Sequence, residues 1–236
     1  MPLVIGVTGS IATGKTGLCE HLVERWGAIH SDADKVVHRM FDPGKPGFDN
    51  AVKEFGDEIV GDDGYIDRKK VGAIVFGNPE AMGRWTRAIG NIADEIKSVI
   101  DGWRETLDDD QVAIMEAVNL IEAGYSGWCE QTWLAAAEND TAMRRMMARD
   151  NFNEDEAKQR LSSQRSWEDR APASDHVFHN DGTLEDLMTE VDAEMERVVG
   201  LHKAGTLPKS VWFDWREKNP SPQRRPEAGS KAGDDA

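Results

Sequence analysis

The feature that most constrains the fold is the segment Gly9–Thr16, which reads Gly-Ser-Ile-Ala-Thr-Gly-Lys-Thr and fits the pattern G-x-x-x-x-G-K-[ST]. Glycines in this pattern let the backbone curl, so that successive N–H groups and the N-terminus of the following helix face phosphate oxygens. The apolar run 3–7 precedes the loop, as a buried strand would. Behind the loop, Leu18, Leu22 and Trp26 recur every four residues, as on an amphipathic helix. A strand, a loop and a helix in this order predict a nucleoside triphosphate site in an α/β fold.

Each residue of the loop has an expected part in binding ATP. Lys15 is expected to reach the β- and γ-phosphates, and the Thr16 hydroxyl to ligate Mg²⁺. The predicted ATP-binding residues are Gly9, Ser10, Ile11, Ala12, Thr13, Gly14, Lys15, Thr16 and Gly17. Because GTPases, motor ATPases and small-molecule kinases share this loop, it identifies a triphosphate site and not a reaction.

Two carboxylates follow the second predicted strand, which covers residues 28–30. A kinase must orient and deprotonate an acceptor hydroxyl beside the γ-phosphate, and ligands of open α/β sheets bind outside the carboxyl ends of the strands. Asp32 is therefore a candidate general base. The alternative role is that of a helix N-cap, which Asp34 could equally fill.

The rest of the chain predicts a P-loop kinase arrangement of three layers around a parallel sheet. Further strands are expected at 112–115, 132–137 and 176–179, and an amphipathic helix at 184–199. We expect a kinase domain over residues 1–200, with a helical acceptor-binding insertion at 35–105 and a helical lid at 142–170. One apolar stripe of this insertion runs from Ile89 to Trp103. Residues 201–236 form a C-terminal extension that is expected to be largely flexible after about residue 219.

Composition limits the partners and the compartment. The net charge of −16 should repel nucleic acid and anionic membranes, and no stretch of 18 apolar residues could span a bilayer. Cys19 and Cys129 suggest neither a disulfide framework nor a zinc site. With no signal peptide recognised at the start, a cytoplasmic monomer or small homo-oligomer is expected.

Against this acidic background, arginines cluster in the predicted lid. Positive charge that arrives when a lid closes stabilises phosphoryl transfer, which favours a site role for Arg145 and Arg149. Ordinary helix-surface pairing is the expected role of Arg160, Arg165 and Arg170. Glu116, at the end of the third strand, is expected to face the cleft, with a place near the metal as the alternative.

Taken together, these segments resemble the dephospho-CoA kinase family over about residues 1–200. The resemblance rests on IGVTGSIATGK, SDADKVVHRM, PGKPGFDNAVKEFGDEIV, DGYIDRKKVGAIVF, LIEAGY, RRMMARDNFNEDEAKQRLSSQ and SDHVFHNDGTLEDL. It implies that ATP phosphorylates the 3′-hydroxyl of the ribose of dephospho-CoA.

The resemblance also implies roles for single residues. Asp32 would be the general base, Lys15 would bind the transferring phosphate and Thr16 would hold Mg²⁺. The lid would supply Arg145 and Arg149. Asn180 would lie near the adenine, and Asp34, His38 and Arg68 would border the acceptor.

Several positions differ from the family pattern. Ala12 stands for the second loop glycine, and Gly17 for a hydroxyl residue. Gly90-Asn91 replaces a His-Pro pair, Val118-Asn119-Leu120-Ile121 replaces Pro-Leu-Leu-Phe, and Ala142 replaces a lid glutamine. Two alternatives therefore stay open: a P-loop kinase for another nucleoside-like or nucleotide-like acceptor, and a nucleotide-binding sensor without activity.

Overall fold

The computed structural model describes residues 1–150 and 152–220, and its centre is a sheet of five parallel strands. The strands lie in the order β2-β3-β1-β4-β5, and each neighbouring pair is parallel. Their bounds are β1 Leu3–Gly9, β2 Ile29–Asp32, β3 Val112–Glu116, β4 Gln131–Ala136 and β5 His176–His179. The predicted parallel sheet is thereby confirmed, and β1 at its centre carries the loop at its carboxyl end.

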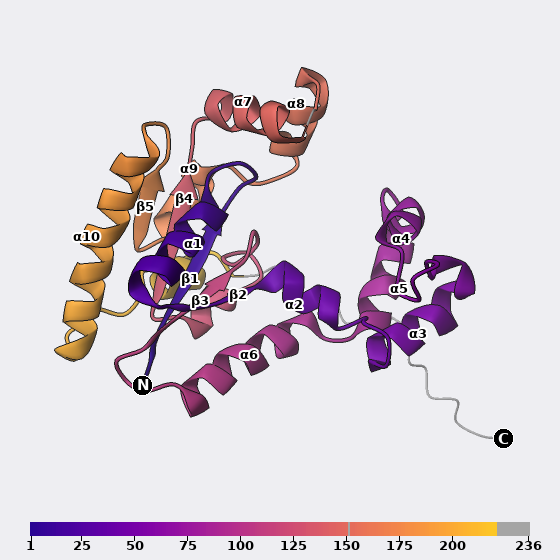
Figure 1. The fold of residues 1–236 in the computed structure, drawn as a ribbon, viewed down its shortest axis with the longest axis horizontal. Coiled ribbons are helices and arrows are strands. Elements are labelled where there is room, and N and C mark those ends of the chain that lie inside the picture. The colour runs from indigo at the N-terminus through magenta and orange to yellow at the C-terminus, as the bar shows by residue number, and fades with distance from the viewer. Residues whose placement is uncertain (151, 221–236) are drawn as a thin grey trace.

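Helices cover both faces of the sheet (Figure 1). On one face, α1 (Lys15–Trp26) and α10 (Leu184–Lys203) pack against β1 and β5, and Leu18, Phe178 and Val191 are fully buried there. On the other face, α2 (Ala33–Arg39) and α6 (Ile92–Thr106) form a second core. Two apolar faces, each covered by helices, account for the unbroken burial of β1 and give the predicted three layers.

A third, separate core lies beside the sheet. It is built by α3 (Pro46–Phe55), α4 (Arg68–Val75) and α5 (Pro79–Ile89), with a short 3₁₀ helix, η1, at Asp57–Ile59. Figure 1 shows these helices as a block that joins the sheet through α2 and α6.

The predicted stripe from residue 89 to 103 belongs to two helices rather than one. The chain breaks at Gly90, whose φ is 106°, and the Asn91 side chain accepts from the Ala93 N–H to begin α6. Because a left-handed backbone favours glycine and a helix start favours asparagine, the departure at Gly90-Asn91 has a local structural role.

The predicted lid contains three helices after β4: α7 (Asn139–Asp150), α8 (Glu154–Ser162) and α9 (Trp167–Arg170). A short 3₁₀ helix, η2 (Tyr125–Trp128), precedes β4, and another, η3 (Ala171–Ala173), follows α9. The described part of the C-terminal extension contains α11 (Trp212–Lys218), whose Trp212 is buried against the body. The flexibility predicted after residue 219 concerns mainly residues 221–236, which lie outside the described residues. In the part that is described, no helix is long and apolar enough to cross a bilayer.

Candidate active site

The phosphate-binding loop begins at the carboxyl end of β1 and leads directly into α1. Gly14 ends the loop as the N-cap of α1 with a φ of 94°, and a Cβ at this position would collide with the side-chain amide of Asn180. Ala12 has a φ of 62°, which is also in the left-handed region. The family pattern has glycine at this position, so the chain keeps the loop conformation while losing the residue that adopts it most easily.

Glu116 connects the loop to β3. Its Oε1 accepts from the Lys15 ammonium at 2.7 Å and from the Thr16 hydroxyl at 3.0 Å, and its Oε2 lies 2.9 Å from His30 Nε2. Burial raises the pKa of this carboxyl, but the bonds from His30, Lys15 and Thr16 outweigh burial and lower the pKa to about 2. Glu116 is therefore a buried anion that holds both functional side chains of the loop.

Asp32 lies beside Glu116 at the same edge of the sheet. It is the last residue of β2, and its register partner on β3 is Glu116. Asp32 also caps α2, because its Oδ1 accepts from the Asp34 N–H at 2.9 Å. The cap is thus formed by Asp32, while Asp34 is exposed in the first turn of α2. The second oxygen, Oδ2, is 3.9 Å from Lys35 Nζ and makes no shorter contact with a basic group of the described chain.

His38 and Arg68 come together although they are far apart in the chain. His38 is in the last turn of α2 and Arg68 begins α4, and Arg68 Nη1 lies 3.3 Å from His38 Nε2. The Arg68 backbone is fixed by Asp67, whose carboxylate accepts from the Lys69 and Lys70 N–H groups. Both side chains lie on the path from Asp32 through α2 to the third core.

The lid arginines and Asn180 surround one side of the loop. Arg145 Nη2 donates to Asn180 Oδ1 at 3.2 Å, and the Asn180 amide donates to the Thr13 carbonyl at 3.0 Å. These residues line a hollow of about 550 Å³ together with Ala12, Gly14, Ala148, Arg149 and Leu184. Arg149 is exposed and forms two hydrogen bonds of 2.8 Å with its neighbour Asp150. Residues of the predicted lid and of the loop therefore line this hollow together.

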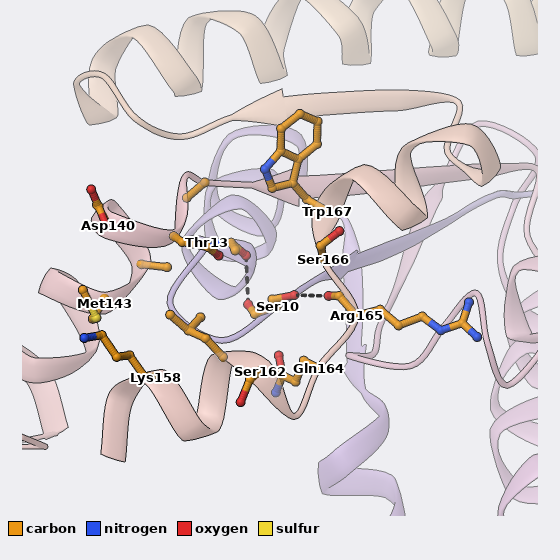
Figure 2. A pocket seen from close by; sticks show the side chains of 14 residues that line it. Ser10, Thr13, Asp140, Met143, Lys158, Ser162, Gln164, Arg165, Ser166 and Trp167 are labelled. Carbon is orange, nitrogen blue, oxygen red and sulfur yellow. Dashed lines mark hydrogen bonds between the residues drawn. The ribbon is translucent and has the colours of Figure 1, made fainter. Parts of the chain in front are cut away.

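A second hollow, of about 440 Å³, lies between the loop and the helices α7, α8 and α9 (Figure 2). The Ser10 hydroxyl donates to the Arg165 carbonyl at 3.1 Å, and the Ile11 N–H donates to Gln164 Oε1 at 2.9 Å. Figure 2 shows the Arg165 guanidinium directed away from Ser10, so only its backbone contacts the loop. The Arg160 guanidinium lies 4.4 Å from the centre of the Phe152 ring.

The prediction for Arg170 was wrong. Its side chain is 1% exposed, and it donates to Glu122 Oε1 at 2.8 Å and to Ser10 Oγ at 2.9 Å. Sequence reasoning placed Arg170 on a helix surface because nothing local shows a partner 48 or 160 residues away. The contacts of Glu116 with Lys15, Thr16 and His30 were not predicted for the same reason. The only local signal for Glu116 was its position at the end of an apolar strand.

The oxygen donors at the loop fit a Mg²⁺ ion. The Thr16 hydroxyl and the Glu116 carboxylate meet at one point, and hard oxygen ligands of this kind suit Mg²⁺. Cys19, His30 and Glu116 also place one donor atom each within 4.8 Å of one another. However, burial raises the pKa of the Cys19 thiol well above its usual range, and a protonated thiol is a poor metal ligand.

Comparison with known proteins agrees with this geometry. A sequence model of the dephospho-CoA kinase family matches residues 3–186. The dephospho-CoA kinase of Streptococcus pneumoniae is 32% identical over 198 residues, which are 83% of this chain and 96% of the relative. That of Geobacter sulfurreducens is 34% identical over 189 residues, which are 80% and 95% of the two chains.

Solved structures extend the similarity to the fold. The crystal structure of TT1252 from Thermus thermophilus has a TM-score of 0.69 at 25% identity, and the alignment covers 84% of this chain and 98% of that one. A dephospho-CoA kinase from Campylobacter jejuni has a TM-score of 0.55 at 22% identity, with 82% and 96% covered. The second likeness supports the fold alone.

Proposed function

The chain belongs to the dephospho-CoA kinase family, and from this premise we propose how its residues carry out the reaction. The activity is the ATP-dependent phosphorylation of dephospho-CoA to coenzyme A. This decides against the two alternatives left open by the sequence, a kinase for another acceptor and a sensor without activity. The residue roles below are our proposal.

ATP binding begins with an exchange of partners at Lys15. In the structure the Lys15 ammonium pairs with Glu116 at 2.7 Å, and the side chain of Lys15 is 13% exposed and that of Glu116 4% exposed. A triphosphate in the loop offers stronger negative charge, so Lys15 turns to the β- and γ-phosphates while the loop N–H groups bind the same oxygens. Residues 9–17 then cradle the phosphates.

Mg²⁺ would be held by Thr16, with Glu116 as the neighbouring carboxylate. With Lys15 on the phosphates, Glu116 Oε1 could coordinate the ion or accept a hydrogen bond from one of its water ligands. When bound, Mg²⁺ neutralises charge on the transferring phosphoryl group. His30, 2.9 Å from the other carboxylate oxygen, keeps Glu116 in position through this exchange.

Asp32 is the proposed general base for the 3′-hydroxyl of the acceptor ribose. Neighbouring strands lie about 4.8 Å apart, so Asp32 is one strand away from the carboxylate that holds Lys15 and Thr16. Its cap contact uses Oδ1 and leaves Oδ2 for the hydroxyl. Asp34, His38 and Arg68 would then border the acceptor, and the helical core of α3, α4 and α5 would form its binding wall.

The lid would add positive charge when it closes. Arg145 already contacts Asn180 beside the hollow, where the adenine would lie. Arg149 would leave Asp150 and join the phosphates, which places charge at the site only when substrate is present. The residues 142–170 would act as this lid.

The observation that carries the proposal is the adjacency of Asp32 and Glu116 on neighbouring strands, next to Lys15. Its test is Asp32→Asn, with Asp34→Asn as the matched control two residues away. We expect Asp32→Asn to lose about 100-fold or more in kcat, because a general base contributes that much. Asp34→Asn should lose far less.

ATP binding, measured by calorimetry in the presence of Mg²⁺, should persist in both variants. ADP formation with dephospho-CoA as acceptor reports turnover. Full activity of Asp32→Asn, or equal losses in both variants, would refute the assignment of the base. Lys15→Ala should lose both ATP binding and turnover.

A further inference from the structure

An ion pair behind the phosphate loop joins the end of α9 to the turn that follows β3. Arg170, at the end of α9, is 1% exposed and donates from Nε to Glu122 Oε1 at 2.8 Å. The other oxygen of Glu122 is buried and has no hydrogen-bond partner among residues 1–150 and 152–220. Arg170 is thus the cation that compensates Glu122, and a buried arginine in such a pair has little freedom to move.

The same arginine fixes the first half of the loop. Its Nη1 donates to Ser10 Oγ at 2.9 Å, and the Ser10 hydroxyl donates onward to the Arg165 carbonyl at 3.1 Å. The next residue, Ile11, donates its N–H to Gln164 Oε1. Contacts from residues 164–170 therefore hold the Ser10 side chain and the Ile11 backbone in place, which lowers the cost of ordering the loop when it binds phosphate.

The C-terminal extension packs on both segments that carry this ion pair. Trp212 of α11 is buried against Ile121, which precedes Glu122, and against Ala173, three residues after Arg170. Its indole N–H lies 3.4 Å from the Ile121 carbonyl. The Trp212 ring also lies so close to Gly127 that a Cβ there would contact it at 2.9 Å.

A second set of contacts anchors the start of α11. Asp175 accepts from the Ser210 hydroxyl at 2.6 Å and from the Val211 N–H at 2.9 Å, and it also accepts from the Thr132 N–H of β4. The extension is therefore attached to the loop before β5, on the chain segment that follows Arg170. At the far end of α11, Arg216 Nη2 lies 3.5 Å from the Glu122 carbonyl.

We propose that α11 is a positioning element of the ATP site: Trp212 fixes the Glu122–Arg170 pair, and this pair fixes Ser10 of the phosphate loop. The proposal rests on the ATP-binding role of the loop given above. The family model ends at residue 186, so Trp212 lies outside the segment that the family match describes. Because the loop binds phosphates in the ground state and in the transition state alike, loss of this positioning should raise the KM for ATP and leave kcat unchanged.

The test uses the full chain with Trp212→Ala and, as a control, Val198→Ala. Val198 is fully buried on the side of α10 that packs on the sheet, so its truncation loosens that core without removing the contacts of Trp212 with Ile121 and Ala173. We expect Trp212→Ala to raise the KM for ATP roughly tenfold, as for one lost buried hydrogen bond, with the KM for dephospho-CoA unchanged. Val198→Ala should lower the melting temperature and leave both KM values unchanged.

Two further variants keep the test decisive if Trp212→Ala fails to fold. Trp212→Phe keeps a ring against Ile121 and Ala173 and should restore most of the ATP affinity. Ser10→Ala removes the hydroxyl that receives the Arg170 contact and should raise the KM for ATP on its own. In the double variant of Ser10→Ala with Trp212→Ala, the effects should be less than additive, since both act through the same contact.

An unchanged KM for ATP in a folded Trp212→Ala protein would overturn the proposal, and so would additive effects with Ser10→Ala. Failure of the proposed function would look different. If the wild-type chain did not phosphorylate dephospho-CoA, calorimetric ATP binding by the same variants would still report whether Trp212 positions the loop.

Discussion

The left-handed backbone at Ala12 predicts that glycine at this position stabilises the protein. Among the non-glycine residues that the structure describes, Ala12 is the one with a positive φ, at 62°. An L-residue in the left-handed helical region is destabilised by about 1–2 kcal/mol relative to its right-handed form. Glycine avoids this strain, but its more flexible unfolded chain costs about 0.4–1 kcal/mol. Ala12→Gly should therefore raise the free energy of unfolding by about 0.5–1 kcal/mol.

The assay is equilibrium unfolding in urea without nucleotide. For a slope near 2–3 kcal/mol per molar urea, the expected gain moves the midpoint upward by about 0.3 M. The slope itself should not change, because the substitution leaves the extent of the folded core as it is.

Gly17→Ala is the matched control, since it makes the opposite exchange one turn away. Gly17 is inside α1, and a Cβ there would meet nothing within 4 Å. Alanine should stabilise this helical position by about 0.5–1 kcal/mol. Both variants should thus gain stability although one adds a glycine and the other removes one. A loss of stability in Ala12→Gly, with the expected gain in Gly17→Ala, would refute the argument from backbone strain.

Three further predictions concern the contacts of the loop. The pKa of Glu116 falls from near 4.5 in the unfolded chain to about 2 in the folded protein, so the ionised carboxylate stabilises the fold at any pH above about 4.5. Glu116→Gln should therefore lower the free energy of unfolding by up to about 3 kcal/mol at pH 7. The difference in free energy of unfolding between the variant and the wild type should shrink as the pH falls from about 5 towards 2. Urea unfolding at several pH values measures this difference, and a difference that stayed constant would contradict the argument. Gly14→Ala, which would collide with the Asn180 amide at a φ of 94°, should abolish ATP binding in calorimetry, whereas retained affinity would mean that the loop can rearrange. Asn180→Ala, which removes the bonds to Thr13 and Arg145, should weaken ATP binding roughly tenfold, and an unchanged dissociation constant would exclude Asn180 from the site.

Local patterns predicted the parts of the fold that depend on neighbouring residues. The strand before Gly9, the loop and the helix from Lys15 follow from apolar spacing and glycine positions within 26 residues, and the structure confirms all three. The strand ending near Asp32 was predicted in the same way, with its end two residues too early. The apolar stripe from Ile89 to Trp103 was predicted from its periodicity, but the break at Gly90 was not, because periodicity alone does not show a left-handed φ.

Contacts between distant residues could not be predicted in this way. The bonds of Glu116 to Lys15, Thr16 and His30 join residues about 100 positions apart in the chain. These residues meet only because the order of the strands places β1, β2 and β3 side by side. The burial of Arg170 against Glu122 likewise depends on how α9 returns to the sheet.

The sequence by itself determined the triphosphate loop, the parallel α/β class and, through the resemblance now supported by the family match, the reaction. These properties are carried by short segments whose backbone geometry is set by glycines, caps and apolar spacing within one or two turns. Only the tertiary structure decided that Glu116 holds the loop lysine, that Arg170 lies behind Ser10, and that Trp212 packs on both sides of that arginine's ion pair. The physical reason is that a buried charge needs an opposite charge beside it, and the order of the strands and the packing of the helices decide which residue supplies it. A local sequence pattern contains no information about a partner that is distant in the chain.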